Sequence, residues 1–169
     1  QRIFYDKASV SFHSFARNSL VKRMKGDWLL MFDCDHVFEP DIAARMVQRM
    51  YLHDVEVITG LYQYKFPPYA PVLYRKYKQG HAIIGDWDKT VTFQQIDSAG
   101  AGCLLVKKTV FLRIIDELKE EPFDIIPPMG EDNSFFDRLR RLKIKAYFDP
   151  TIECNHLVYK PITLDNFQK

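Results

Sequence analysis

The stretch "LLMFDCDHVFEPD", residues 29–41, is unusual because an apolar run ends abruptly in two aspartates one residue apart. The run Trp28–Phe32 is uncharged and predicts a strand buried on both faces. Residues i and i+2 of a strand share a face, so Asp33 and Asp35 should lie together, with Cys34 pointing into the core. Two close carboxylates repel each other unless a cation lies between them or one is protonated. Oxygen ligands suit Mg²⁺ or Mn²⁺, so the pair predicts a divalent-cation site.

An alternative for the aspartates is a helix N-cap, which is a common place for this residue. The next helix already has Glu39 and Asp41 at its start, with Pro40 near its first position. The cation site is therefore the favoured interpretation, and the N-cap remains open.

Helices and strands interleave along the rest of the chain. Apolar spacing predicts helices at residues 9–25, 40–53, 108–119 and 131–143. Apolar or alternating runs predict strands at residues 55–64, 89–96, 103–108, 144–149 and 151–158, and an irregular loop and hairpin at 65–80. This order predicts an α/β fold with a mixed, mostly parallel sheet flanked by helices. We expect one domain over residues 1–169, with 160–169 as a tail.

Composition narrows the classes of function. The chain has 169 residues, of which 47% are hydrophobic and 27% charged, as in a globular protein with a real core. A net charge of +2 does not predict nucleic-acid binding, so an anionic partner must meet a local site. No apolar run is long enough to span a membrane, and no signal peptide is visible.

The three cysteines, Cys34, Cys103 and Cys154, show no CxxC spacing and sit beside apolar residues. That pattern favours buried, reduced thiols in a cytoplasmic protein and argues against a zinc site.

Three further groups are candidates, each with an ordinary structural explanation. Glu131 and Asp132 open an amphipathic helix, where acidic residues are favourable in any case. His156 is a lone histidine near the end of the last strand, and such residues are more often packed or exposed than ligands. Arg17 lies in an otherwise apolar helix, where it either reaches a phosphate or a nucleobase or lies on a solvated face. Aromatic residues, dense between 62 and 93, either stack on sugars or pack in the core.

Three segments, in this order, resemble GT-A-fold glycosyltransferases, especially those of family 2. They are "ARNSLVKRMKGDWLLMFDCDHVFEPD" (16–41), "SAGAGCLLVKKTVF" (98–111) and "GEDNSFFDRLRRLKIKAYFDPTIECNHL" (130–157). A DxD pair alone is a weak signal, whereas the ordered set with its spacing is fairly specific.

The resemblance implies a role for each candidate. Asp33 and Asp35 would be the DxD pair that binds Mn²⁺ or Mg²⁺ and, through it, a nucleotide-sugar diphosphate. His156 would complete the shell of the metal or the diphosphate. The remaining implied assignments are Asp132, or less favourably Glu131, as general base, Arg17 at the nucleotide, and Gly100, Ala101 and Gly102 along the donor sugar and acceptor.

The implied reaction moves a sugar from a nucleotide-diphosphate sugar to a hydroxyl of a glycan, lipid or protein. The metal would stabilise the diphosphate that leaves, and a carboxylate would take the proton of the incoming hydroxyl. If one base acts opposite the leaving group, the anomeric configuration inverts.

One feature departs from the family pattern. These enzymes normally begin with a strand–helix–strand unit that holds the nucleoside, whereas Asp33 here follows only 32 residues. We therefore expect an N-terminally short domain, or a piece of a longer protein.

Two alternatives stay open. "LLMFDCDHVF" also fits a haloacid-dehalogenase-like phosphatase, with Asp33 as nucleophile and Asp132 and Asp137 as later acidic residues, although His36 and Val37 match that motif imperfectly. The other alternative is a non-catalytic GT-A-like module that binds metal and nucleotide without turnover.

Overall fold

The computed structural model describes residues 12–77, 80–83, 88 and 90–158, so the expected tail at 160–169 lies outside the described residues. Within these residues, six strands form the main sheet in the order β1-β8-β3-β9-β2, and β6 also pairs with β9. Their bounds are β1 Trp28–Phe32, β2 His36–Phe38, β3 Val57–Leu61, β6 Gln94–Ile96, β8 Cys103–Lys107 and β9 Ala146–His156. A smaller sheet, β5-β4-β7, is built from β4 Leu73–Tyr77, β5 Gly80–Ile83 and β7 Ser98–Ala99.

In the described part of the chain, four α-helices lie close to the positions that apolar spacing predicts. They are α1 His13–Arg23, α2 Ile42–His53, α3 Lys108–Arg113 and α4 Glu131–Arg141, and one π-helical turn, η1 Ile114–Leu118, continues α3. The hairpin expected within 65–80 forms from β4 and β5. The strand expected at 89–96 is shorter, and the two expected at the end of the chain are one strand, β9.

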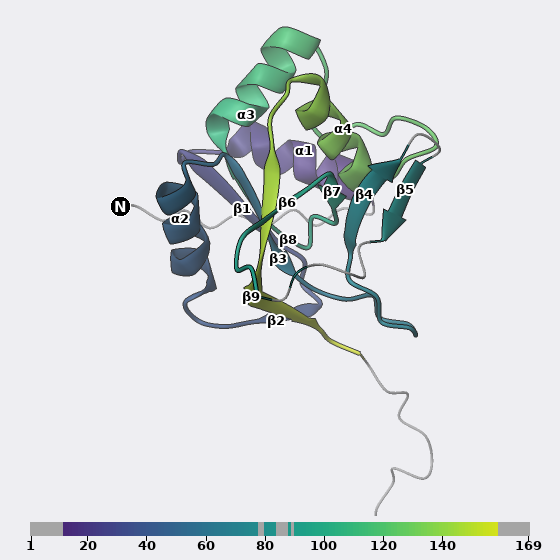
Figure 1. Cartoon of the computed structure of the whole chain (residues 1–169). Helices are drawn as coiled ribbons and strands as arrows, with labels where there is room; N and C mark the ends of the chain where they lie inside the picture. The colour runs from purple at the N-terminus through teal and green to yellow at the C-terminus, as the bar shows by residue number, and fades with distance from the viewer. Residues whose placement is uncertain (1–11, 78–79, 84–87, 89, 159–169) are drawn as a thin grey trace, which may run out of the picture.

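Helices cover both faces of the main sheet. Alternate side chains of β8 show this, because they pack against helices on opposite faces. Leu104 and Val106 pack in one core cluster with residues of α1, α3 and α4, whereas Cys103 and Leu105 pack in a second cluster with residues of α2. Neighbouring strand residues face opposite sides, so one apolar strand serves both clusters. Figure 1 shows α2 apart from the other three helices, with β9 running through the molecule and the β4–β5 hairpin at its edge.

The expectation of a mostly parallel sheet is wrong. Within the described residues, β3–β9 is parallel and the other pairings of the main sheet are antiparallel. The physical reason is the route of the chain after the inserted β4–β5 hairpin. It enters β8 from the end at which β1 stops, with Cys103 opposite Phe32, so β8 runs against both β1 and β3.

The expectation that β1 is buried on both faces is also wrong. Met31 is buried, but Phe32 is 42% exposed and the rest of the strand is half-buried. Among the described strands, β1 lies at the edge of the main sheet and pairs with β8. Its apolar residues therefore cover one buried face and one partly buried face.

β9 changes neighbours along its length. Its first residues pair with β6 and β3, and Cys154–His156 pair with β2, which places His156 opposite His36. The register with β3 shifts between Gly60 and Leu61. Asp149, which is fully buried, lies at this bulge and accepts a hydrogen bond from Arg49 of α2 at 2.6 Å. The bulge is therefore held from the α2 side of the sheet.

Candidate functional site

Asp33, Cys34 and Asp35 form a turn between β1 and β2, because strand geometry ends at Phe32. The two carboxylates consequently have different neighbours, Arg17 for Asp33 and Lys65 for Asp35. The prediction that Cys34 points into the core is wrong, since Cys34 is exposed, whereas Cys103 and Cys154 are buried free thiols as expected. Strand alternation does not extend through a turn.

Arg17 is buried and joins three of the predicted segments. Its Nη1 lies 3.5 Å from Asp33 Oδ1 and donates to the carbonyl of Ala101 at 3.2 Å. Its Nε lies 3.5 Å from Asp132 Oδ1 and 3.7 Å from Glu131 Oε1. Burial alone would lower the pKa of Arg17, but these carboxylates raise it, so the guanidinium stays charged. The solvated-face alternative for Arg17 is thereby excluded.

Asn18, the neighbour of Arg17, fixes α1 against the loop before α4. Its amide oxygen accepts from the Phe123 N–H at 2.9 Å, and its amide nitrogen donates to Asp124 at 2.9 Å. At the start of α4, the Ser134 hydroxyl donates to the Gly130 carbonyl at 2.7 Å. These local bonds hold Arg17 and the acidic first turn of α4 in contact.

Asp132 has the electrostatics of a base. Burial, together with the nearby charges of Glu131 and Asp33, raises its pKa to about 6, although Arg17 acts in the opposite direction. Its Oδ1 is buried without a hydrogen bond, yet 28% of the side chain remains exposed. A carboxylate in this state can accept a proton near neutral pH and remain reachable from solvent.

The Gly100–Gly102 turn allows close approach of the surrounding side chains. A Cβ on Gly102 would lie 2.9 Å from His36 Cε1 and 3.2 Å from Asp33 Oδ2, and one on Gly100 would lie 2.0 Å from the Tyr62 hydroxyl oxygen. The Gly102 N–H donates to that hydroxyl at 3.1 Å. Glycine is therefore required here for space, and the turn lies between Asp33, His36 and Tyr62.

The structure brings His156 to Asp35, together with a third residue, His36. Within the described part of the chain, one ligand atom from each of these three lies within 4.8 Å of the others. His36 Nδ1 is 3.1 Å from Asp35 Oδ1, and the two imidazole rings are 3.9 Å apart. Asp33 is not one of the three, but it borders the same space beside Gly102.

These three residues fit a divalent cation. The His36 ring is fully buried, and while its Nδ1 lies 3.1 Å from Asp35 Oδ1, its Nε2 has no hydrogen-bond partner, which is costly for a polar group unless a ligand is bound. Burial and the neighbouring His156 lower the pKa of His36, which keeps the ring neutral, as a metal ligand must be. His156 Nδ1 is hydrogen-bonded to the Gln63 carbonyl, which orients the ring and leaves Nε2 for a metal.

Asp35 also has a cationic partner. Lys65 Nζ lies 2.5 Å from Asp35 Oδ2. Burial alone would raise the pKa of Asp35, but the hydrogen bond and charge of Lys65 hold it below its usual range. A pocket of about 230 Å³ opens beside this pair and is lined by Gln63, Tyr64, Lys65, Tyr69, Asn155, His156 and Val158. Two of the predicted aromatic residues thus border the candidate site.

Sequence reasoning missed His36 and Lys65 as site residues, whereas Tyr62 belongs to the aromatic group between residues 62 and 93. His36 directly follows the DxD pair, and that position in the sequence is the one signal that could have identified it. No local signal identifies Lys65, because its contact with Asp35 depends on the course of the loop between β3 and β4.

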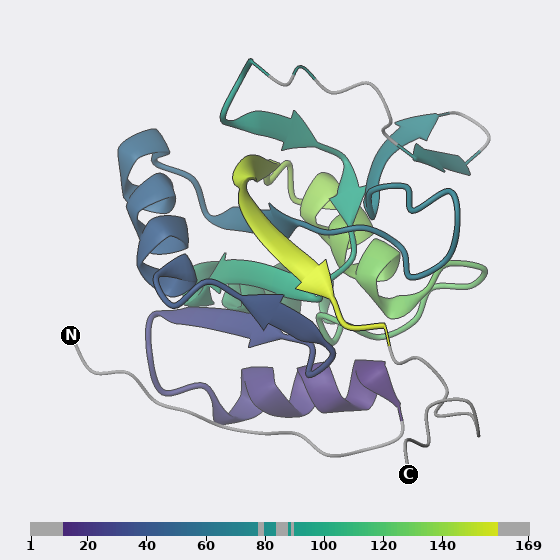
Figure 2. The ribbon, with the colours of Figure 1, turned by 90° about the horizontal axis from the view of Figure 1, so that it is seen from below.

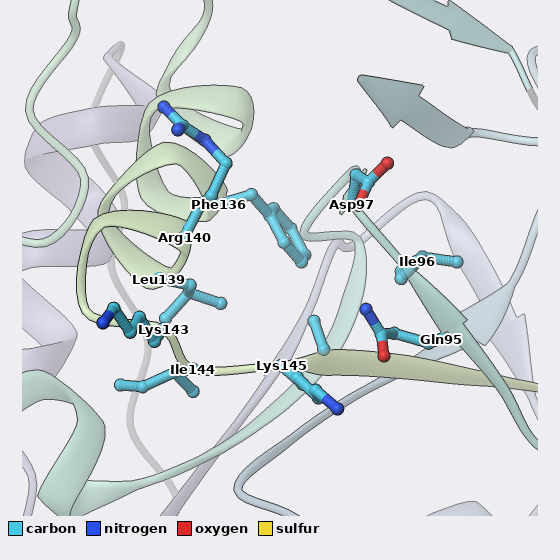
Figure 3. A pocket seen from close by; sticks show the side chains of 10 residues that line it. Gln95, Ile96, Asp97, Phe136, Leu139, Arg140, Lys143, Ile144 and Lys145 are labelled. Atoms are coloured by element: carbon cyan, nitrogen blue, oxygen red, sulfur yellow. The ribbon is translucent and has the colours of Figure 1, made fainter. Parts of the chain in front are cut away.

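A second pocket of about 230 Å³ lies at the other end of α4 (Figure 3). Phe136 and Leu139 of α4 face Gln95 of β6 across it, and basic residues of the α4 end stand around it. None of the predicted site residues lines this pocket.

No helix within the described ranges is long and apolar enough to cross a membrane. The cytoplasmic location therefore stays a prediction.

Comparisons with known proteins identify the family and similar folds. A family model described as glycosyl transferase family 2 matches residues 3–103. Among solved structures, "Crystal Structure of A197 from STIV" matches with a TM-score of 0.61 at 21% identity, covering 86% of this chain and 68% of that one. An apo UDP-glucose pyrophosphorylase matches with a TM-score of 0.51 at 10% identity, covering 85% of this chain and 54% of the other. At these identities the structural matches show the fold alone. No curated protein sequence matches the chain.

Proposed function

Because the chain belongs to glycosyl transferase family 2, we propose that it transfers a sugar from a nucleotide-diphosphate sugar to an acceptor hydroxyl, with a divalent cation at Asp35, His36 and His156. Asp33 supplies a further carboxylate at the edge of this site. When bound, the cation supplies Lewis-acid stabilisation of the diphosphate that leaves.

One observation carries the proposal. Asp132, whose pKa is raised to about 6, lies 3.5 Å from the same guanidinium that contacts Asp33. A group able to take a proton is therefore linked by one buried cation to the motif that would bind the donor. Glu131 contributes negative charge beside it and is the weaker candidate for the base.

In the proposed reaction, Asp132 accepts the proton of the acceptor hydroxyl as the oxygen bonds to the anomeric carbon. The bond between that carbon and the donor phosphate breaks, and the electron pair leaves with the diphosphate. Attack from the face opposite the leaving group inverts the anomeric configuration. Arg17, fixed by its carboxylate neighbours, positions Asp132 and Asp33 relative to each other. The acceptor is a hydroxyl of a glycan, lipid or protein.

Family membership favours this reaction over the haloacid-dehalogenase-like phosphatase. The non-catalytic alternative would bind metal and nucleotide but would not turn over a donor. An assay of donor turnover therefore distinguishes it from the proposed enzyme.

The test is release of nucleoside diphosphate from a panel of nucleotide sugars with Mn²⁺. We expect release from the wild-type protein with at least one donor, and its loss in Asp35→Ala. Asp132→Asn should bind the donor but lose transfer by about 100-fold or more, since general base catalysis contributes factors of that order.

The matched control is Asp137→Asn, a second carboxylate of α4, which pairs with Lys76 and Arg140. This variant should keep wild-type transfer. Metal-dependent donor binding without release from any donor would favour the non-catalytic module, and transfer at the wild-type rate by Asp132→Asn would refute its role as base.

A further inference from the structure

Lys65 and the metal-binding residues share one carboxylate. Asp35 Oδ2 lies 2.5 Å from Lys65 Nζ, while Asp35 Oδ1 lies 3.1 Å from His36 Nδ1. Lys65 also stands beside His156 on the wall of the same pocket, and Gln63, two residues earlier, holds the His156 ring. One short segment after β3 thus places both a histidine ligand and an ammonium group at Asp35.

A divalent cation at this site would meet the Lys65 ammonium at close range. Two positive charges a few ångströms apart repel, and only partial screening is available near a half-buried carboxylate. If Lys65 moves away, its ion pair with Asp35 is lost; if it stays, its ammonium repels the cation. In either case the site binds the cation alone more weakly. The Lys65 side chain is 33% exposed on a flexible four-carbon stem, so the ammonium has room to move.

A diphosphate changes the sign of this effect. Its negative charges attract both the cation and the ammonium, and lysine is a frequent phosphate ligand. We propose that Lys65 is a built-in counter-ion of Asp35 that makes cation binding depend on the donor diphosphate, to which its ammonium turns once the cation is bound. This inference rests on the proposed function, since it assumes the metal site at Asp35, His36 and His156.

The consequence is reciprocal coupling, because two ligands that strengthen each other do so by the same factor in both directions. Lys65 lowers affinity for the free cation and raises affinity for the cation–diphosphate pair. Removing its charge should therefore change the two affinities in opposite directions, a result that loss of packing alone would not produce.

The experiment compares wild type with Lys65→Met, which keeps the length of the stem and removes the charge. Binding of Mn²⁺ alone is measured by electron paramagnetic resonance of the free ion. Binding of preformed manganese pyrophosphate is measured by calorimetry. We expect Lys65→Met to bind Mn²⁺ roughly tenfold more tightly, and manganese pyrophosphate roughly tenfold more weakly, than wild type. Lys65→Arg should restore the wild-type pattern.

Lys76→Met is the matched control. Lys76 is 35% exposed and pairs with Asp137 at 3.2 Å, so its loss changes the net charge equally at a similar pair. It should leave both affinities unchanged. Unchanged or weaker Mn²⁺ binding in Lys65→Met would overturn the inference about Lys65. If Asp35→Asn loses Mn²⁺ binding in the same experiment, the metal site of the proposed function would still be supported. No binding of Mn²⁺ or manganese pyrophosphate by any variant would overturn the metal site and the inference together.

Discussion

Arg17 is the residue on which the arrangement of the site most depends. It lies between Asp33, Glu131 and Asp132, and without it these carboxylates would face one another in a partly buried space. Its charge also opposes the rise in the pKa of Asp132. Arg17 thereby sets how far above its ordinary value the proposed base titrates.

Transfer should accordingly depend on pH through Asp132. The base works only when deprotonated, so activity at saturating Mn²⁺ should fall as pH drops through about 6 and be flat above it. In Arg17→Gln the inflection should move to higher pH, because the charge that favours the carboxylate is lost. Initial rates from pH 5 to 9 check both expectations.

Arg140→Gln is the control for this profile, since Arg140 pairs with Asp137 on α4, outside the proposed site. Its inflection should match that of wild type. A profile without an inflection between pH 5 and 7 in wild type would argue against Asp132 as the base.

Part of the candidate site could be predicted from the sequence. The residue types and their order pointed to Arg17, Asp132 and His156 as candidates. The contacts of Arg17 could not be predicted, because they join segments far apart in the chain. His36 was missed because it lies in the three-residue strand β2, which is placed by pairing with β9 and not by any periodicity of its own.

At the scale of elements, the turn from β7 into β8 holds the site together. Gly100 and Gly102 pack against Tyr62, whose hydroxyl accepts the Gly102 N–H. Tyr62 in turn packs edge-on against His36 and His156, with ring centroids 4.8 and 5.3 Å away. The glycine turn and the two histidines are therefore connected through one buried aromatic ring.

Gly100→Ala should destabilise the protein by about 1–3 kcal/mol, because its Cβ would lie 2.0 Å from the Tyr62 hydroxyl oxygen. Tyr62→Phe should cost a similar amount, about 1–3 kcal/mol, by leaving the Gly102 N–H without its acceptor. The double variant should be more stable than the sum of the two costs by about 1 kcal/mol, since removing the hydroxyl removes the shortest of the close contacts. Urea unfolding of the four proteins measures this coupling. Additive costs would show that the backbone shifts instead.

The elements themselves were largely predictable, and their directions were not. Apolar periodicity places all four helices and the strand Trp28–Phe32, because these are local properties. The direction of β8 depends on where the chain returns from the β4–β5 insertion, which no local pattern records. The sequence predicted two strands at residues 144–149 and 151–158, but β9 is one strand that continues through the bulge with β3.

In the molecule as a whole, the main sheet separates two hydrophobic clusters, and the candidate site lies where β1 and β3 end and β8 begins. Figure 2 shows the end of β9, in yellow, close to β2 and the turn that precedes it, in dark blue. The α/β layering followed from the order of elements. The mostly antiparallel pairing did not, because strand order is set by long-range packing. The proposed metal ligands come from the turn after β1, from β2 and from the end of β9.

A cation that joins these elements should stabilise the whole fold. At a Mn²⁺ concentration of about a hundred times its Kd, linkage predicts a gain of about 2.7 kcal/mol. That gain corresponds to a rise in Tm of several degrees for a domain of this size. Thermal unfolding with Mn²⁺ and then with excess chelator measures the effect and its reversal.

His156→Ala should show no Mn²⁺-dependent rise in Tm, whereas His53→Ala, a change at an exposed histidine of α2, should keep the rise. An equal rise in His156→Ala would place the bound cation elsewhere.

The bulge that divides β9 has a further consequence, for how the molecule opens locally. The half of the strand before the bulge lies between β3 and β6, whereas the half that ends at His156 pairs with the short strand β2. Cooperative units of a fold often end where pairing is interrupted, and units with fewer buried contacts open at lower free energy. We therefore expect the His156 end of β9, which pairs with a strand of three residues, to open at lower free energy than the half before the bulge. A ligand that joins His36 to His156 would act first on that end of the strand, slowing the exchange of its backbone amides with solvent deuterium.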